Sequence, residues 1–274
     1  MADTSIQQVV AQALVEDLGS GDVSAALLDE TLVDAHIICR ESAVLCGIAY
    51  ASEAFAQLDQ HIRVDWAVED GQGLEPGQTI CHIRGNARAI ISAERVALNF
   101  LQTLSATATQ TRSLVDCISH TQAKLLDTRK TIPGLRLAQK YAVTCGGGEN
   151  HRIGLYDAVM LKENHIAATG SITAAAAKAQ SAYPSLPLIV EVETLAQLQE
   201  ALALSGITRI LCDNFELEQL AQAVKLATGI YPLEASGNID RHNIAQVAET
   251  GVDYISIGSI TKHIQAIDFS LRFV

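Results

Sequence analysis

The sequence predicts a two-part α/β protein, in which an N-terminal α+β layer arrangement is followed by an incomplete α/β barrel. Short apolar runs recur after about residue 120, and stretches with helical periodicity separate them. The predicted strand ends are Asp127, Lys162, Glu191, Asp213, Ser236 and Gly258, with spacings of 35, 29, 22, 23 and 22 residues. Such spacings are typical of βα units, whose parallel strands read as continuous apolar runs. Six strands are visible and a closed barrel needs eight, so we predict an open barrel.

The N-terminal part has a different pattern, which predicts an α+β layer arrangement. Helices are predicted at residues 6–17 and 48–58, and strands at residues 34–40, 63–67 and 80–85. A long amphipathic helix, residues 91–120, would join the two parts, and four barrel helices are predicted at residues 173–182, 195–204, 217–227 and 241–249. The alternating residues 268–274 predict a closing strand that returns to the N-terminal sheet. The predicted domains are residues 1–107 with the terminal strand 266–274, and residues 108–265.

Composition excludes several classes of protein. The 274 residues are 49% hydrophobic and carry a net charge of −12, with a pI near 5.0 and 4% aromatics. These values disfavour nucleic-acid binding, which needs a basic face and stacking platforms. No apolar run reaches the roughly 18 residues of a membrane span, and residues 1–17 do not have the pattern of a signal peptide. Six scattered cysteines without metal spacing indicate free thiols, so a cytoplasmic location is expected.

Positive charge is concentrated between residues 125 and 165. Six of the nineteen Lys and Arg residues fall there, together with two histidines: Arg129, Lys130, Arg136, Lys140, Arg152, Lys162, His151 and His165. Salt screens surface charges beyond about 8 Å, so distant acidic residues would hardly cancel such a local site. One charge pair at about 4 Å and an effective dielectric of 20 is worth about 4 kcal/mol before desolvation. The cluster therefore suits a polyanionic small molecule.

Each cationic motif also has an ordinary structural explanation. Arg129 and Lys130 directly follow a predicted strand, where an arginine fork and a lysine point charge suit carboxylate or phosphate, but such a pair is more often a solvated face. The three glycines at positions 146–148 could let the backbone approach an anion, or form a loop or a helix cap. Lys162 ends an apolar run and could face a ligand or extend to solvent.

Acidic residues follow neighbouring predicted strands. Glu191 and Glu193 alternate in V-E-V-E, which predicts that both point to one face of the same strand, and Asp213 ends the next strand. Such carboxylates can hold Mg²⁺ through water or accept hydrogen bonds from ribose hydroxyls. An ion pair with Lys162 is an alternative that can coexist with these roles.

The last two predicted strands end in small polar residues. Barrels commonly build a phosphate site at this position from backbone amides and a helix N-terminus. The candidates are Ser236, Gly237, Asn238, Gly258 and Ser259. Each could instead belong to an ordinary turn.

The ordered set of motifs resembles the quinolinate phosphoribosyltransferase family over essentially the whole chain. The motifs are E-D-L-G-S-G-D (16–22), A-E-R-V-A-L-N-F (93–100), L-D-T-R-K-T-I-P-G-L-R (126–136), G-G-G-E-N-H-R (146–152), L-K-E-N-H (161–165), V-E-V-E, D-N, E-A-S-G-N-I and G-S-I-T-K-H. The resemblance implies a pentosyltransferase that converts quinolinate and phosphoribosyl pyrophosphate to nicotinate mononucleotide, pyrophosphate and CO₂ in NAD biosynthesis. It also implies an N-terminal α/β sandwich beside an incomplete, open α/β barrel, a requirement for Mg²⁺ and a homodimer.

The resemblance further implies roles for individual residues. Arg95 would complete the partner subunit's site, and the quinolinate pocket would contain Arg129, His151, Arg152 and Lys162, with Lys130 near the pyrophosphate. Glu193 and Asp213 match the ribose and metal positions, with Glu191 ranked lower, and Lys130, Lys162, Glu193 and Asp213 are the implied catalytic residues. Lys262 stands where many relatives have histidine, and the segment between V-E-V-E and D-N is one residue shorter, which leaves the choice between Glu191 and Glu193 open.

Two other functions remain open at this point. One is a related phosphoribosyltransferase that uses another aromatic acid, like the similar protein of molybdenum-transport systems. The other is a non-catalytic module that binds phosphosugars. The full set of polar residues from Arg129 to Asp213 argues against the second, since a phosphosugar sensor does not need a pocket for two carboxylates.

Overall fold

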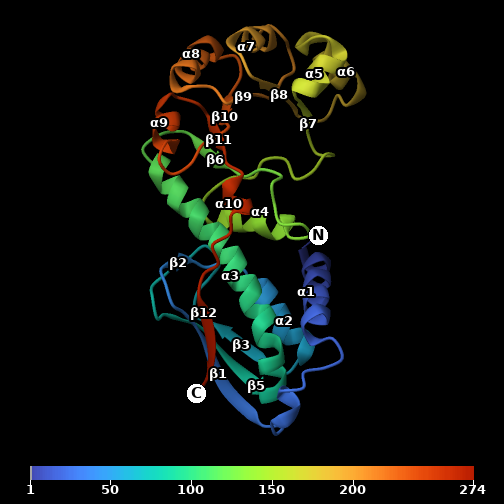
Figure 1. The fold of residues 1–274 in the computed structure, drawn as a ribbon, viewed down its shortest axis with the longest axis vertical. Coiled ribbons are helices and arrows are strands. Elements are labelled where there is room, and N and C mark those ends of the chain that lie inside the picture. The colour runs from blue at the N-terminus through green and yellow to red at the C-terminus, as the bar shows by residue number, and fades with distance from the viewer. Residues whose placement is uncertain (1) are drawn as a thin grey trace. The chain divides into compact units, whose positions relative to one another are not determined.

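The computed structural model describes residues 2–274, with side chains from residue 6 onward (Figure 1). The chain divides into two compact units. Unit 1 contains residues 1–110, 133–147 and 263–274, and unit 2 contains residues 111–132 and 148–262. The segment Pro133–Gly147 therefore groups with unit 1, whereas the predicted boundary placed it in the barrel domain.

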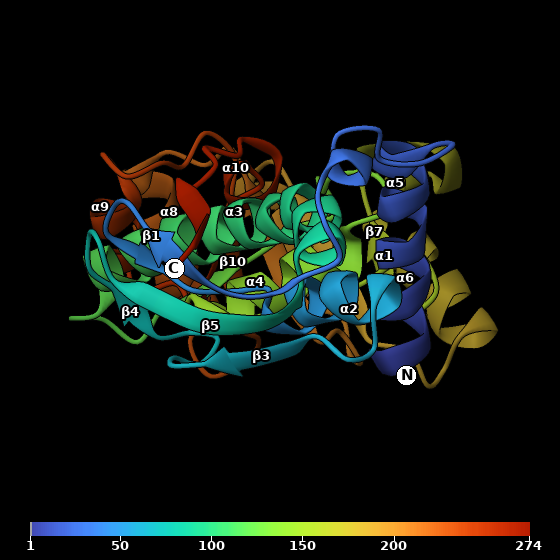
Figure 2. The same cartoon turned by 90° about the horizontal axis from the view of Figure 1, so that it is seen from below.

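Unit 1 contains an antiparallel sheet with strand order β12-β1-β5-β3. The strands are β1 (Leu32–Cys39), β3 (Arg63–Trp66), β5 (Thr79–Asn86) and β12 (Phe269–Phe273). Figure 2 shows β5 between β1 and β3. The terminal strand β12 pairs with β1, from Ala35 opposite Phe273 to Cys39 opposite Phe269. The strand expected at the end of the chain is thus part of the N-terminal sheet.

Helices of unit 1 bury apolar side chains together with this sheet. They are α1 (Ala2–Leu18), α2 (Ile48–Leu58), α4 (Arg136–Cys145) and the first part of α3 (Ala87–Ile118), besides the short 3₁₀ helix η1 (Ala25–Leu27) and the small sheet of β2 (Ala43–Val44) and β4 (Gly73–Leu74). In β1, Ala35, Ile37 and Cys39 are buried at every second position, as expected for a strand with one face on a core. Tyr50 of α2 stacks on Phe100 of α3 with ring centroids 5.1 Å apart.

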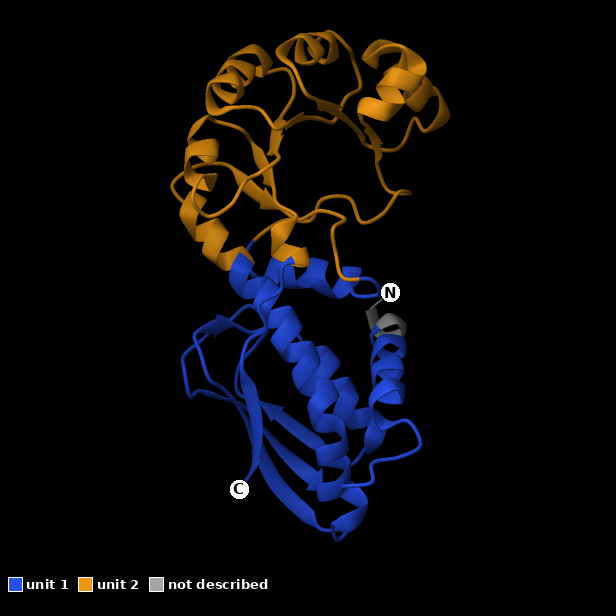
Figure 3. Ribbon diagram, in the orientation of Figure 1, with its two compact units in different colours: residues 1–110, 133–147, 263–274 blue, residues 111–132, 148–262 orange. Residues whose placement is uncertain are grey.

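Unit 2 contains six parallel strands in the order β6-β11-β10-β9-β8-β7 (orange in Figure 3). The strands are β6 (Lys124–Leu126), β7 (Val159–Leu161), β8 (Leu188–Val192), β9 (Arg209–Asp213), β10 (Leu233–Ser236) and β11 (Tyr254–Ser256). Five helices lie outside them: α5 (Glu163–Thr169), α6 (Ile172–Ala182), α7 (Leu195–Leu202), α8 (Leu217–Ala227) and α9 (Ile244–Glu249) (Figure 1). The two edge strands, β6 and β7, do not pair with each other in the described sheet, so the barrel is open as predicted.

Every predicted strand end of the barrel lies within two residues of an observed end, but the short helix α5 was not predicted, and neither were two other helices. The first is α4, in which Gln139 and Lys140 are buried along with alanines and a valine. Its buried face is therefore not the apolar stripe on which helix prediction depends. The second is the one-turn helix α10 (Ser259–Lys262), which is too short to show a period. Gly146 caps the end of α4 and Gly147 has φ +91°, so the glycine run contains a helix cap.

In the part of the chain that the structure describes, no helix combines the length and apolarity needed to cross a membrane.

Candidate active site at the carboxyl ends of the barrel strands

A cavity of about 320 Å³ lies at the carboxyl ends of the unit 2 strands. Each of the six strands contributes to it, either directly or through an adjacent loop. The lining residues are Thr128, Arg129, Lys130, His151, Arg152, Met160, Lys162, Glu191, Leu211, Glu234, Ser236 and Ser256. Parallel strands have their carboxyl ends at one edge of the sheet, which explains why residues far apart in the sequence meet here.

The cations of the cavity come from the two edge strands. Arg129 and Lys130 follow β6, while Arg152 precedes β7 and Lys162 follows it. Burial lowers the pKa of Arg152, and the charge of Arg129 lowers it further. The two guanidinium groups therefore act on the same space, and positive charge gathers locally in an acidic protein. Arg136 and Lys140, which belong to the same cationic stretch of sequence, lie on α4 in unit 1.

The segment from residue 149 to residue 158 connects the two edges of the open sheet. Glu149 forms a parallel bridge with Leu126, and its N–H donates to the Leu125 carbonyl at 2.8 Å. At the other end, Nη1 of Arg152 donates to the Ala158 carbonyl at 3.3 Å, directly before β7. Asp157 stiffens this segment, because its carboxylate accepts the N–H groups of Ile153 and Gly154 at 2.7 and 2.9 Å. The cationic cavity thus lies where the barrel fails to close.

Both the backbone and the imidazole ring of His151 form hydrogen bonds. The buried Asp127 carboxylate accepts the His151 N–H at 2.8 Å. Nδ1 of His151 accepts the N–H of Arg152 at 2.6 Å. A ring nitrogen that accepts a backbone N–H carries no proton, so the proton of a neutral imidazole is on Nε2.

Lys162 and Glu191 form an ion pair in the cavity, with Nζ and Oε2 2.6 Å apart. This pair is the alternative that the sequence left open for Lys162. Burial raises the pKa of Glu191, Lys162 offsets part of the increase, and the charge of Asp213 adds to it. Asp213 is half-buried at the end of β9 and accepts a hydrogen bond from Asn214 at 2.7 Å. Glu191 and Asp213 therefore form an acidic side of the site, where Lys162 is paired with Glu191.

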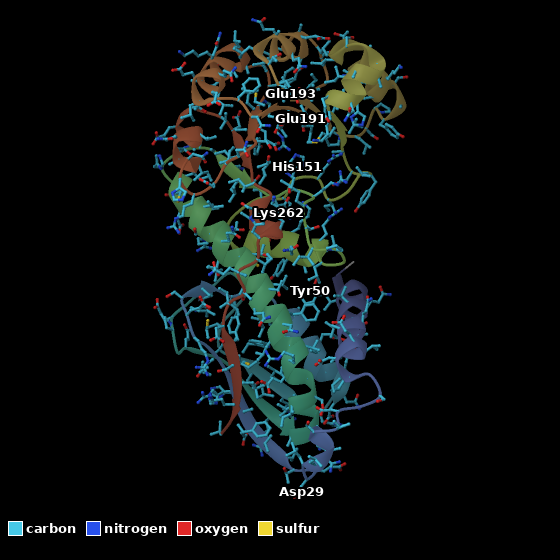
Figure 4. All side chains as sticks on the ribbon, in the orientation of Figure 1. Asp29, Tyr50, His151, Glu191, Glu193 and Lys262 are labelled. Carbon is cyan, nitrogen blue, oxygen red and sulfur yellow. The ribbon has the colours of Figure 1, made fainter. Side chains whose placement is uncertain are left out.

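Glu193 lies apart from Glu191, which corrects the prediction that both side chains share one strand face. The strand β8 ends at Val192, so the alternation does not extend to Glu193. Glu193 is exposed and its N–H donates to the Gln197 side chain at 2.7 Å. Of the two glutamates, Glu191 lines the cavity (both are labelled in Figure 4).

Among the phosphate candidates, Ser236 lines the cavity and the next two residues form an adjoining turn. Gly237 and Asn238 have φ values of +98° and +51°, and Asn214 on the neighbouring loop has φ +55°. Asn238 donates to the Asn214 side chain at 3.2 Å. A Cβ on Gly237 would lie 2.2 Å from Oδ1 of Asn214, so only glycine fits between these loops.

The loop after β11 is fastened to the loop after β6. A Cβ on Gly258 would lie 2.7 Å from Cδ of Lys130, and Oγ1 of Thr261 donates to the Lys130 carbonyl at 2.8 Å. Ser259 and Lys262 begin and end α10, and Lys262 is exposed. Gly258, Ser259 and Lys262 therefore adjoin the Lys130 loop but are not part of the cavity lining. Arg95 is exposed on α3 in unit 1.

Two family models match this chain. The C-terminal domain of quinolinate phosphoribosyl transferase matches residues 107–272, and the N-terminal domain of the same enzyme matches residues 22–105. The chain belongs to the quinolinate phosphoribosyltransferase family. The cavity described above lies within the region matched by the C-terminal model.

Similar proteins of this family cover nearly the whole chain. A probable nicotinate-nucleotide pyrophosphorylase [carboxylating] from Bacillus subtilis is 40% identical, with 99% of this chain and 94% of that protein covered. A mitochondrial quinolinate phosphoribosyltransferase [decarboxylating] from Nicotiana tabacum is 40% identical, with 97% and 82% covered. The solved structure of the nicotinate-nucleotide pyrophosphorylase from Francisella tularensis is 47% identical, has a TM-score of 0.98, and covers 100% of this chain and 98% of its own.

Glu234 is a residue of this quinolinate phosphoribosyltransferase site that sequence reasoning missed. It is fully buried in β10, beneath the cavity. The sequence contained a signal for it, because burying a glutamate in the apolar strand P-L-E-A-S is costly unless charged or polar groups face it. The nonpolar Met160 and Leu211, which belong to a small cluster with Ala158 and Ile189, were missed because they resemble ordinary core residues.

Proposed function

We propose that this chain transfers phosphoribose from phosphoribosyl pyrophosphate to quinolinate with decarboxylation, giving nicotinate mononucleotide, pyrophosphate and CO₂. The observation that carries this proposal is the cavity in which Arg129, Lys130, Arg152 and Lys162 face Glu191. Quinolinate carries two adjacent carboxylates, and such a dianion fits several converging cations. The names of the Bacillus subtilis and Nicotiana tabacum relatives describe the same reaction, written in its two directions.

The two arginines are the proposed carboxylate ligands. Arginine presents a planar fork that matches the geometry of a carboxylate, and its charge is permanent. Besides burial, the positive charge of Arg129 lowers the pKa of Arg152, so these two guanidinium groups repel each other. A bound dianion would relieve that repulsion, so the site favours a ligand with two negative groups over one with a single negative group.

Positioning accounts for most of the proposed catalysis. The pyridine nitrogen of quinolinate is already a nucleophile, so the reaction needs no general base to activate it. Holding that nitrogen against the ribose carbon makes the attack effectively unimolecular. Lys130, on the loop fastened to Gly258 and Thr261, is placed to neutralise the departing pyrophosphate. After attack the ring nitrogen is cationic, and its charge stabilises the carbanion that loss of CO₂ leaves beside it.

Magnesium is part of this proposal, and the acidic side of the site fits it. Among the described residues no group of three His, Cys, Asp or Glu side chains is arranged to hold a metal ion. Mg²⁺ is commonly bound by one or two carboxylates together with waters and substrate phosphates, so such a group is not required. Glu191 and Asp213, with Glu193 nearby in sequence, are the proposed carboxylates. Bound Mg²⁺ would supply charge neutralisation for the pyrophosphate.

We also propose a homodimer in which Arg95 completes the partner subunit's site. This rests on the resemblance of the segment 93–100 to the family pattern and on the exposure of Arg95 on its helix. For the compartment we propose the cytoplasm, because the six cysteines are all free thiols and free thiols suit a reducing environment.

The reaction is tested by mixing the purified protein with quinolinate, phosphoribosyl pyrophosphate and Mg²⁺, with nicotinate and a second pyridine dicarboxylate as competing acids. We expect equal amounts of nicotinate mononucleotide and CO₂ from quinolinate, and little product from the other acids. Arg152→Ala should raise the KM for quinolinate much more than the KM for phosphoribosyl pyrophosphate. Product without CO₂, or a preference for another acid, would contradict the proposal.

The shared site is tested by mixing two inactive variants, Arg95→Ala and Lys162→Ala. A heterodimer has one site with both native residues, so full subunit exchange should restore about a quarter of the wild-type activity. Exchange is followed with differently tagged subunits. If heterodimers form and stay inactive, Arg95 does not complete the partner's site.

A further inference from the structure

A second polar layer lies inside the barrel, directly beneath the cavity. Glu234 of β10 is opposite Leu211 of β9 and Tyr254 of β11 in the sheet register. Arg209 precedes Leu211 by two residues, and side chains two apart on a strand share a face. Arg209, Glu234 and Tyr254 therefore point to the same face of the sheet as the cavity-lining Leu211.

Glu234 is a charged residue of the cavity lining that has no solvent-exposed surface. It is 0% exposed, and a buried carboxylate is tolerated only where it is compensated. Oε2 of Glu234 lies 2.8 Å from Nε of Arg209 and 3.4 Å from Nε2 of His151. Arg209 is therefore the nearer of the two groups that compensate Glu234. The Arg209 guanidinium in turn lies over the Tyr254 ring, 4.8 Å from its centroid.

These contacts keep Glu234 ionised. Burial acts to raise its pKa, but His151, Arg209 and the Ser256 hydroxyl outweigh burial, and the pKa is lowered overall. Arg209 is a permanent cation, so it compensates Glu234 whether or not His151 carries a charge. In the structure Nε2 of His151 faces Glu234, and Nδ1 accepts the Arg152 N–H.

We propose that Glu234, compensated by Arg209, is a positioning residue that fixes the tautomer and orientation of His151 and thereby holds Arg152 in place for the quinolinate carboxylates. Each link is a contact between named atoms: Arg209 to Glu234, Glu234 to His151, and His151 Nδ1 to the Arg152 backbone. The arrangement resembles carboxylate–histidine pairs in metal and catalytic sites, where the carboxylate selects the histidine nitrogen that bears the proton. The quinolinate part of this inference rests on the proposed function.

The test variant is Glu234→Gln, which keeps the shape and removes the charge. We expect the KM for quinolinate to rise about tenfold to a hundredfold, in line with other residues that orient a ligand-binding side chain. The kcat and the KM for phosphoribosyl pyrophosphate should change much less. Glu249→Gln is the matched control, because Glu249 contacts His120 at 3.2 Å in an exposed pair outside the cavity, and it should change neither constant.

A double-variant cycle separates positioning from general loss of structure. If Glu234 acts through His151, Glu234→Gln adds little to the KM for quinolinate in a His151→Asn background. Independent, multiplying effects would overturn the inference. Glu234→Gln combined with Arg209→Met removes both buried charges; a folded double variant with wild-type KM would show that an unpaired Arg209, and not His151, caused the defect.

The histidine part has a readout that does not depend on activity. Nitrogen-15 NMR of labelled histidine should show the Nε2–H tautomer for His151 in the free wild-type protein and a mixture of states in Glu234→Gln. An unchanged His151 signal in Glu234→Gln would reject the inference even if activity falls. A wild-type protein that does not convert quinolinate would instead reject the proposed function, and the NMR result would still decide whether Glu234 fixes His151.

Discussion

The edge strands and the central strands of the unit 2 sheet contribute different chemistry to the same cavity. The edges, β6 and β7, supply side-chain cations: Arg129 and Lys130 on one side, Arg152 and Lys162 on the other. The central strands supply carboxylates, hydroxyls and turns with left-handed backbone, from Glu191 in β8 to Ser236 and Gly237 at the end of β10. A dianionic acid therefore suits the edges, and a phosphorylated sugar with its metal suits the centre.

This division has a structural cause. Central strands are hydrogen-bonded on both sides, so their ends are fixed and closely spaced, which suits small residues and backbone contacts. Edge strands have one free side, and here the segment 149–158 lies between them and brings Arg152 toward Arg129. Long, charged side chains can span the wider space at the open seam.

The largest expected effect comes from removing an edge cation with Lys162→Ala. Lys162 is the cation paired with Glu191, so its loss leaves the buried Glu191 carboxylate without that partner, next to the proposed quinolinate site. The loss also removes a positive charge that would stabilise the transition state. We expect kcat/KM to fall by about a hundredfold to a thousandfold. Steady-state kinetics with both substrates measures the loss.

Lys124→Ala is the matched control for this variant. Lys124 forms a pair with Glu149 of the same 2.6 Å length, but at the amino end of β6 and in a more exposed position. Exposed pairs contribute little, so activity should stay within about twofold of wild type. Equal losses of activity in the two variants would mean that Lys162 acts by stabilising the fold. The proposed difference between the edge strands and the central strands would then lose its main support.

A smaller effect is expected from the central side, with Gly237→Ala. The new Cβ would lie 2.2 Å from Oδ1 and 2.9 Å from the backbone N of Asn214, in a residue with φ +98°. Because the loops after β9 and β10 must shift, we expect the KM for phosphoribosyl pyrophosphate to rise about tenfold, which corresponds to roughly 1.4 kcal/mol. The KM for quinolinate should change less, in contrast to the edge variants.

Gly229→Ala separates the clash from backbone strain. Gly229 also has a positive φ, +76°, but nothing lies within 4 Å of its would-be Cβ. In both variants an alanine must adopt left-handed backbone angles, so both should lose some stability, which thermal unfolding measures. If Gly229→Ala raises the KM for phosphoribosyl pyrophosphate as much as Gly237→Ala does, the close approach of Gly237 to Asn214 is not what shapes the central side.

The same division decides what could be predicted from the sequence. Strand ends such as Lys162, Glu191 and Asp213 could be placed because buried parallel strands are continuous apolar runs that stop at a polar residue. The cations could be found because arginine and lysine are recognised as charged residues from the sequence alone. The direction of the Glu193 side chain was wrongly predicted, because alternation holds only while the strand continues, and β8 ends at Val192.

Features that arise from tertiary contacts could not be read in this way. The tautomer of His151 depends on a 2.6 Å contact with the next residue's N–H, which residue types alone do not encode. The compensation of Glu234 depends on Arg209, a residue from another strand that was counted in no motif. Helix α4 was missed because its buried face includes Gln139 and Lys140, and polar residues break the periodic signal.

The smallest expected effect distinguishes two buried carboxylates of the central strands, Glu191 and Glu234, through the pH dependence of stability. The pKa of Glu191 is raised above the usual 4.5, so the ionised form costs folding energy: its contribution is fully present below pH 4.5 and is lost as pH rises through the folded pKa. The pKa of Glu234 is lowered, so its contribution is present above pH 4.5 and is lost only as pH falls through its folded pKa.

Melting temperatures of Glu191→Gln, Glu234→Gln and wild type between pH 5 and 8 test this contrast. Relative to wild type, Glu191→Gln should gain a few degrees as pH rises, because glutamine avoids the cost of the buried charge. Glu234→Gln should be less stable than wild type by an amount that stays constant over this range, since its titration lies below pH 4.5. The outcome that contradicts this contrast is a melting-temperature difference from wild type that changes with pH in the same direction for both variants. Lys162 alone would then compensate the charge of Glu191 as fully as Arg209, His151 and Ser256 together compensate that of Glu234. The two carboxylates would not be electrostatically distinct.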